Sequence, residues 1–172
     1  MKVVGFAGLS GSGKTTLVEQ LIPRLKGADK RVSVVKHAHH KFDIDHAGKD
    51  SFRHREAGAY EVVVGSNRRL ALIREFAQPT DLDVHALIAE LEPDVDWVLV
   101  EGFKKSALPK LEVWRASSGK PPLYPDDPLI LAIATDSPDR LPEFADRDIL
   151  DLNDPDRIAN WLIEHRDRFD YR

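Results

Sequence analysis

A glycine-rich segment near the start of the chain constrains the fold more than any other feature of the sequence. The letters GLSGSGKTT begin at Gly8 and fit the spacing G-x-x-x-x-G-K-[ST]. A short apolar run, 2–7, precedes the segment, and apolar residues at helical spacing follow it to about residue 26. A strand, a glycine-rich turn and a helix in this order place backbone amides and a helix N-terminus around phosphate oxygens. The sequence therefore predicts a phosphate-binding loop.

Two side chains of this loop carry specific chemistry. Lys14 is placed to reach the β- and γ-phosphates of a nucleotide, and the Thr15 hydroxyl is placed to bind Mg²⁺. A glycine-rich turn without a ligand is the alternative, but the complete spacing between a strand and a helix favours the nucleotide. We expect mononucleotide binding, with Lys14 acting through position and charge.

Strands and helices alternate along the rest of the chain. Further strands are expected at 31–35, 96–100, 111–114 and 129–134, and helices at 49–57, 82–91 and 154–168. Residues 61–64 and 69–73 flank GSNR, which is typical of a hairpin turn and is our candidate dimer element. Pro23 is expected to kink or shorten the first helix. The pattern predicts one α/β domain over residues 1–172, a P-loop NTPase fold whose mostly parallel sheet is flanked by helices and carries an added antiparallel hairpin.

Composition excludes several classes of protein. The chain has 172 residues, of which 42% are hydrophobic, so it can bury a core. Its formal net charge of −4 gives no basic field that indicates nucleic acid. It has no cysteine, which excludes disulfides and thiolate metal sites. We expect a cytoplasmic protein without a membrane segment.

Acidic residues follow two of the predicted strands. In VLVEGF, Glu101 ends an apolar run, where a P-loop protein needs an acid to hold Mg²⁺. In LAIATD, Asp136 ends another, and its carboxylate can accept the N1–H and N2 amine of guanine. A turn or cap role for Asp136 remains open, since Ile133 and Ala134 stand where an NKxD motif has Asn and Lys.

Residues 34–55 hold five of the seven histidines of the chain. They are His37, His39, His40, His46 and His54. Three interpretations of this segment remain open. A metal site would use His37 and His39, which alternate along an extended segment and suit Zn²⁺ or Ni²⁺. A solvated surface loop would bind nothing.

The third interpretation is a switch-like segment that binds an anion beside the γ-phosphate. Lys36, Lys49 and Arg53 would donate to phosphate oxygens of a nucleotide or a pterin, together with the imidazoles. Asp43 or Asp45 would orient a metal ion or a water molecule, and we expect Asp45 to be catalytic. The position directly after the second strand of a P-loop domain favours this interpretation.

Four motifs together resemble one family over nearly the whole chain. The segments GLSGSGKTT, KHAHHKFDIDHAGKDSFRHREAGA, VLVEGFK and PKLEVWR occur in the order and at the length of the molybdopterin-guanine dinucleotide biosynthesis protein B (MobB) family. The resemblance implies a homodimer that binds GTP and hydrolyses it weakly. It also implies an adaptor role in molybdenum cofactor biosynthesis, beside the MobA-type guanylyltransferase that joins GMP to molybdopterin.

The resemblance also assigns residues. The implied nucleotide-binding and anion-binding residues are Gly8, Ser10, Gly11, Ser12, Gly13, Lys14, Thr15, Thr16, His37, His39, His40, Lys49, Arg53 and Asp136. Thr15 and Glu101 are the residues that the resemblance implies for Mg²⁺ binding. Asp136 matches the strand-end aspartate of the family, which favours guanine.

Two other functions remain as alternatives. A small-molecule kinase usually needs an arginine-bearing lid, but the loop 117–128 carries Lys120 and no arginine. A metallochaperone-type GTPase would use the histidines for Ni²⁺, but the chain lacks the soft cysteine ligands often used for metal transfer.

Overall fold

The computed structural model describes residues 1–38, 42–142 and 146–171. The chain divides into two compact units. The first contains Met1–His37 and Asp83–Arg172, and the second contains Ala38–Leu82. His39 and His40 lie outside the described residues, so their predicted roles stay predictions.

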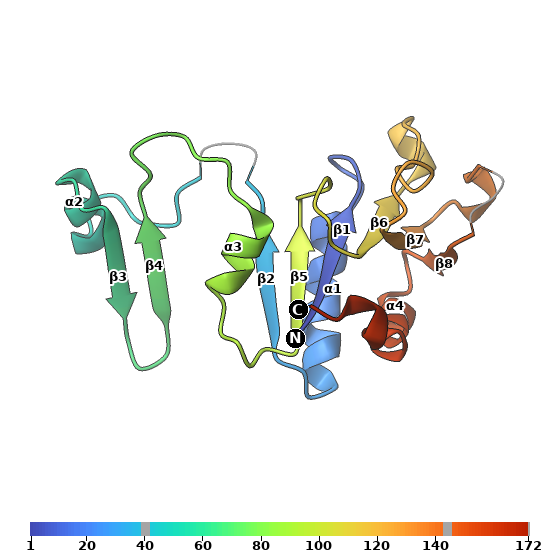
Figure 1. Cartoon of the computed structure of the whole chain (residues 1–172), viewed down its shortest axis with the longest axis horizontal. Helices are drawn as coiled ribbons and strands as arrows, with labels where there is room; N and C mark the ends of the chain where they lie inside the picture. The colour runs from blue at the N-terminus through green and yellow to red at the C-terminus, as the bar shows by residue number, and fades with distance from the viewer. Residues whose placement is uncertain (39–41, 143–145, 172) are drawn as a thin grey trace. The chain divides into compact units, whose positions relative to one another are not determined.

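Six parallel strands form the sheet of the first unit, and Figure 1 shows them as a row of arrows. In sheet order they are β2 (Val32–Lys36), β5 (Trp97–Glu101), β1 (Lys2–Ala7), β6 (Lys110–Trp114), β7 (Ile130–Thr135) and β8 (Asp148–Asp151). The strand β8 was not expected from the sequence, because DILD is short and half of it is acidic. In the folded chain, only Leu150 of this strand is buried. Parallel strands bring their carboxyl ends to one edge of the sheet, so the residues that follow them can meet there.

Helices cover both faces of this sheet. On one face, α1 (Lys14–Gly27) and α4 (Pro155–Glu164) pack with Val4 and Phe6 into the largest core cluster. On the other face, α3 (Val84–Ala89) packs with Val3. The strand β5, WVLVE, is buried along its whole length and is apolar up to Glu101, because both faces of the sheet are covered there. The strand β6 is also fully buried, although it contains Lys110 and Glu112.

Local signals set the ends of the helices. Asp154 accepts a hydrogen bond from the backbone N–H of Arg157 at 3.0 Å, with Pro155 at the first helical position, which confirms the predicted N-terminus of α4. A 3₁₀ turn, η3 (Arg166–Phe169), follows this helix. Pro23 does not shorten α1, which continues to Gly27. Two further 3₁₀ turns are η1 (Ala116–Ser118) and η2 (Pro138–Arg140).

The second unit consists of one short helix and one hairpin. Its elements are α2 (Asp50–Glu56), β3 (Glu61–Gly65) and β4 (Leu70–Arg74). The strands β3 and β4 pair in antiparallel fashion, which confirms the predicted hairpin. A mostly parallel sheet flanked by helices, with an added antiparallel hairpin, is the predicted fold class. No helix in the described part of the chain has both the length and the apolar character that crossing a membrane requires.

Candidate functional site

The loop between β1 and α1 turns through three glycines with positive φ. The φ values are 137° at Gly8, 80° at Gly11 and 100° at Gly13, and residues with a Cβ atom rarely adopt such angles. Gly8 also approaches β6 closely, because a Cβ atom there would lie 2.4 Å from the Val113 carbonyl oxygen. This backbone gives the loop the glycine-dependent path of a phosphate-binding segment at the start of a helix.

Thr15 and Glu101 meet beside this loop. The strand β5 lies next to β1, so the end of β5 comes close to the first turn of α1. The Thr15 hydroxyl donates a hydrogen bond of 2.5 Å to Oε1 of Glu101, a residue with 9% of its surface exposed. A hydroxyl and a carboxylate are hard oxygen donors, so the pair fits Mg²⁺.

Lys14 bends back over the loop that precedes it. Its ammonium donates to the carbonyl oxygens of Gly8 at 3.0 Å and Leu9 at 2.8 Å. Burial lowers the pKa of Lys14, Glu101 opposes that shift, and the nearby cations Lys104 and Lys36 add to it. The predicted lysine therefore lies among the atoms of the loop, close to a carboxylate.

Lys36 is the second cation at this site. It ends β2, and the register of β2 on β5 places it directly beside Glu101. Its ammonium lies 3.3 Å from Oε2 of Glu101 and 3.5 Å from the Thr15 hydroxyl oxygen. The sequence had indicated Lys36 only as a donor to an anion, because the pairing of β2 with β5 is not visible in the sequence.

Asp136 follows β7, and both of its carboxylate oxygens are engaged. The Ser137 hydroxyl donates to Oδ1 at 2.8 Å, and Arg115 forms an ion pair with Oδ2. The Ser137 hydrogen bond, followed by the charge of Arg115, lowers the pKa of Asp136. Arg115 also donates from Nε to the carbonyl oxygen of Ser12 at 3.2 Å, so it connects the carboxylate to the phosphate loop.

Arg115 was missed by the sequence reasoning. It directly follows the strand β6, whose carboxyl end lies between those of β1 and β7. A polar residue after an apolar run was the available signal, but the same signal marks many surface residues.

Of the buried polar side chains, Ser12 has an unusual environment. Its hydroxyl is buried and has no hydrogen-bond partner among the described residues. A buried hydroxyl without a partner is costly, so an acceptor supplied from outside the chain would stabilise it. This fits the predicted role of Ser12 in the phosphate loop.

The segment that contains the histidines begins at the edge of the first unit. The backbone N–H of His37 donates to the carbonyl oxygen of Glu101 at 2.9 Å, and its ring lies 4.8 Å from that of Phe103. A Cβ atom at Gly102 would lie 2.5 Å from Cβ of His37. The predicted metal interpretation gains no support in the described residues, where no group of three or more potential ligands lies together.

Asp45 lies in the second unit and binds residues of that unit. Ser51 donates to its Oδ1 at 2.8 Å, and Arg55 lies 3.0 Å from its Oδ2. The Ser51 hydrogen bond is the main cause of a lowered Asp45 pKa. Lys49 is the N-cap residue of α2, and Arg53, within α2, lies 3.8 Å from Asp50.

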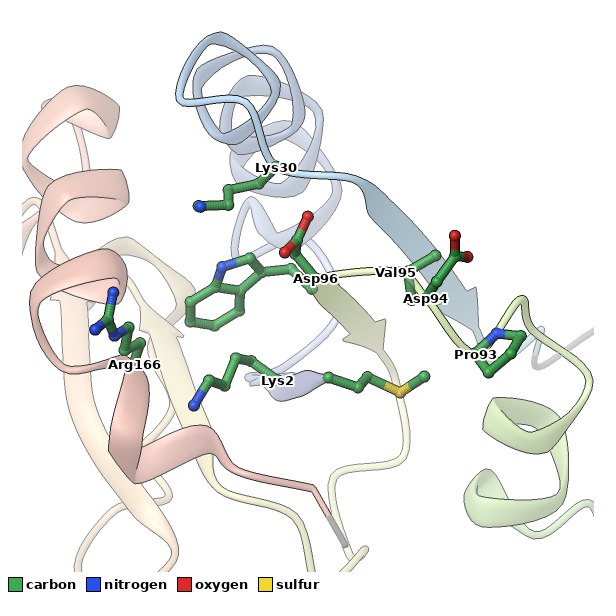
Figure 2. A pocket seen from close by; sticks show the side chains of 9 residues that line it. Lys2, Lys30, Pro93, Asp94, Val95, Asp96 and Arg166 are labelled. Carbon is green, nitrogen blue, oxygen red and sulfur yellow. The ribbon is translucent and has the colours of Figure 1, made fainter.

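A pocket of about 390 Å³ lies at the opposite edge of the sheet, where β1 and β5 begin (Figure 2). Lys2, Lys30 and Arg166 line it together with Asp94 and Asp96. Its charges are of both signs, and none of the predicted site residues contributes to it.

Comparison with known proteins gives one consistent family. The family model for molybdopterin guanine dinucleotide synthesis protein B, MobB, matches residues 3–136. The molybdopterin-guanine dinucleotide biosynthesis adapter protein of Haemophilus influenzae is 42% identical, and the alignment covers 93% of this chain and 89% of that protein. The protein of the same name from Escherichia coli is 37% identical, with coverage of 94% and 91%. The X-ray structure of a MobB homolog from Bacillus stearothermophilus matches with a TM-score of 0.69 and 26% identity, over 97% of this chain and 99% of that one.

Proposed function

The chain belongs to the MobB family, and from this premise we propose that it is a GTP-binding and Mg²⁺-binding adaptor in molybdenum cofactor biosynthesis. Its partner in this proposal is the MobA-type guanylyltransferase that joins GMP to molybdopterin. The proteins that it resembles are named as adapters for biosynthesis of that dinucleotide.

The contact between Thr15 and Glu101 is the observation that carries the nucleotide proposal. A phosphate loop alone binds anions, but a hydroxyl at its end and an acid on the adjacent strand add two oxygen ligands for an octahedral Mg²⁺ ion, beside phosphate and water oxygens. Bound there, Mg²⁺ would neutralise charge on the phosphates. Lys14 and the loop amides would hold the β- and γ-phosphate oxygens, and the hydroxyl of Ser12 would find an acceptor among them.

Guanine recognition rests on Asp136 in this proposal. Its carboxylate is ionised at neutral pH like that of an ordinary aspartate, and Ser137 and Arg115 lower its pKa further, so it can accept both guanine donors. Guanine offers N1–H and an amine on one edge, whereas adenine has no such pair. Ser137 and Arg115 each occupy one acceptor site on the two oxygens of Asp136, and each oxygen has a second lone pair for a guanine donor.

We infer slow GTP hydrolysis. A general base works best when its pKa lies near the working pH, and the pKa of Asp45 is lowered instead. Ser51 and Arg55 already occupy its oxygens. An adaptor can use the bound nucleotide without rapid turnover.

Homodimerisation through the hairpin is part of the proposal. Val63, Leu70 and Leu72 lie on one face of the two strands, and 61%, 72% and 38% of their surfaces are exposed. A two-stranded sheet is marginal by itself, and an apolar face on it is stabilised when a second copy covers it. Changing Val63 and Leu70 to lysine should yield a monomer in analytical ultracentrifugation, while Ile149→Lys, at an exposed site on β8, should leave the dimer intact. A dimer that survives the double change would contradict this part.

Calorimetric titration of the purified protein with GTP, ATP and Mg²⁺ tests the nucleotide proposal. GTP should bind more tightly than ATP, and Glu101→Gln should weaken the dependence on Mg²⁺. Adding molybdopterin and the guanylyltransferase should then increase dinucleotide formation. Rapid transfer of phosphate from ATP to a metabolite would instead support a kinase.

A further inference from the structure

The end of β2 carries a lysine whose position is fixed by the sheet. Lys36 and Glu101 are registered partners in the parallel pair of β2 and β5, so their side chains leave the sheet on the same face. A shift of one residue in this register would move Lys36 to the opposite face. The contact between them is therefore set by the fold and differs from a chance encounter of two long surface side chains.

The ammonium of Lys36 contacts both groups that fit Mg²⁺. It lies 3.3 Å from Oε2 of Glu101 and 3.5 Å from the hydroxyl oxygen of Thr15. The carboxylate of Glu101 is 11% exposed, so its negative charge is poorly solvated and a cation beside it is stabilising. The side chain of Lys36 is 55% exposed, which leaves it room to swing into solvent.

We infer that Lys36 is a built-in competitor of the divalent cation: its ammonium and Mg²⁺ bind the Glu101 and Thr15 oxygens in turn. Two cations on one carboxylate repel each other strongly at these distances. The ammonium would leave the Glu101 and Thr15 oxygens when a metal ion bound there with the nucleotide, and it would return when the site emptied. This inference rests on the proposed nucleotide site.

The exchange is confined to the lysine side chain. The backbone at His37, directly after Lys36, is held to β5, because the N–H of His37 donates to the carbonyl oxygen of Glu101 at 2.9 Å. Gly102 also packs closely against His37, since a Cβ atom at Gly102 would lie 2.5 Å from Cβ of His37. Lys36 thus keeps Glu101 paired with a cation at all times, and it makes metal affinity lower than the two oxygen ligands alone would give.

Binding of Mn²⁺ in the presence of GDP tests the competition. Mn²⁺ replaces Mg²⁺ at oxygen sites, and the paramagnetic resonance signal of free Mn²⁺ gives the dissociation constant without any turnover. Lys36→Met should bind Mn²⁺ about fivefold more tightly than the wild type, the size expected for the loss of one ion pair. Without metal, Lys36→Met should also melt at a lower temperature than the wild type, and saturating Mn²⁺ and GDP should reduce that difference.

Lys104→Met is the matched control. Lys104 is an exposed cation near Lys14, and its charge lowers the pKa of Lys14 in the same direction as that of Lys36, so its loss also changes the general field at the site. Its effect on the Mn²⁺ constant should be less than about twofold. An equal gain in both variants, or an unchanged or weaker constant in Lys36→Met, would overturn the competition. Absence of GDP-dependent Mn²⁺ binding in the wild type would overturn the proposed nucleotide site instead.

Discussion

Gly8→Ala separates two demands that the phosphate loop makes on its first glycine. One is the backbone angle, because φ is 137° at Gly8. The other is space, because the new Cβ atom would lie 2.4 Å from the carbonyl oxygen of Val113. Gly11→Ala is a natural control, since φ there is 80° and no atom lies within 4 Å of the added Cβ. Gly11→Ala carries a cost for the angle of about 1–2 kcal/mol. Gly8→Ala carries at least that cost, because 137° lies further from the left-handed region that side-chain-bearing residues can adopt, and it alone carries the steric cost.

The steric cost gives the size of the effect. A contact of 2.4 Å with a backbone oxygen cannot be relieved by a side-chain rotation, so the loop or β6 has to move. Overpacking of this kind costs about 1–3 kcal/mol. For a chain of this length, that lowers Tm by about 2–12 °C below that of Gly11→Ala. Because the loop itself moves, GTP affinity should also fall further in Gly8→Ala.

Scanning calorimetry and GTP titration of the two variants measure both effects. The expected order of Tm is wild type, then Gly11→Ala, then Gly8→Ala. Equal Tm and equal GTP affinity in the two variants would show that the loop does not need its close approach to β6.

Three further predictions concern carboxylates. Asp136→Asn should reduce the preference for GTP over ATP by about 10- to 100-fold, since the carboxamide cannot accept both guanine donors; competition binding measures this, and an unchanged ratio would contradict it. Glu112 is 1% exposed and accepts hydrogen bonds of 2.6 and 2.9 Å from two backbone N–H groups of the loop 117–128. Glu112→Ala should therefore lower the free energy of unfolding, measured in urea, by about 2–5 kcal/mol. A change near zero would contradict this. The pKa values of Asp43 and Asp45 are lowered, in Asp43 mainly by Arg55. The two ionised carboxylates stabilise the folded protein above about pH 4, and this stabilisation is lost as the pH falls through their folded pKa values. Arg55→Met should therefore make the stability depend less on pH in acid, measured as the acid unfolding transition by circular dichroism. An acid transition that is the same as in the wild type would contradict this.

Local signals explain what could be predicted from the sequence. The strand, loop and helix around Gly8 were predictable because each glycine answers a local backbone requirement. The hairpin was predictable from the residues of its turn, and the start of α4 was predictable from Asp154, which precedes Pro155 as a capping residue. All of these depend on neighbours within a few residues.

Long-range pairing explains what could not be predicted. The contact of Lys36 with Glu101 depends on β2 pairing with β5, although 60 residues of chain separate the end of β2 from the start of β5. The ion pair of Arg115 with Asp136 likewise depends on β6 lying beside β7. A short strand such as β8 forms because β7 offers an edge, and its own sequence gives little indication of it.

Glu112 shows a similar limit. In the sequence it interrupts the apolar residues of KLEVW, and a buried carboxylate there is unfavourable unless it has hydrogen-bond partners. In the structure, the backbone N–H groups of Leu123 and Tyr124 donate to it, and burial raises its pKa. The donors come from a loop that follows the strand, so only the folded chain shows why the residue is tolerated.

Equilibrium binding of GTP and ATP to the purified protein, with and without Mg²⁺, is the decisive measurement of whether this site binds a guanine nucleotide. GTP should bind more tightly than ATP, Mg²⁺ should strengthen the binding of GTP, and Lys14→Ala should abolish it at concentrations where the wild type is saturated. Equal affinity for the two nucleotides would contradict the role of Asp136. GTP binding that is unaffected by both Mg²⁺ and Lys14→Ala would contradict the site itself.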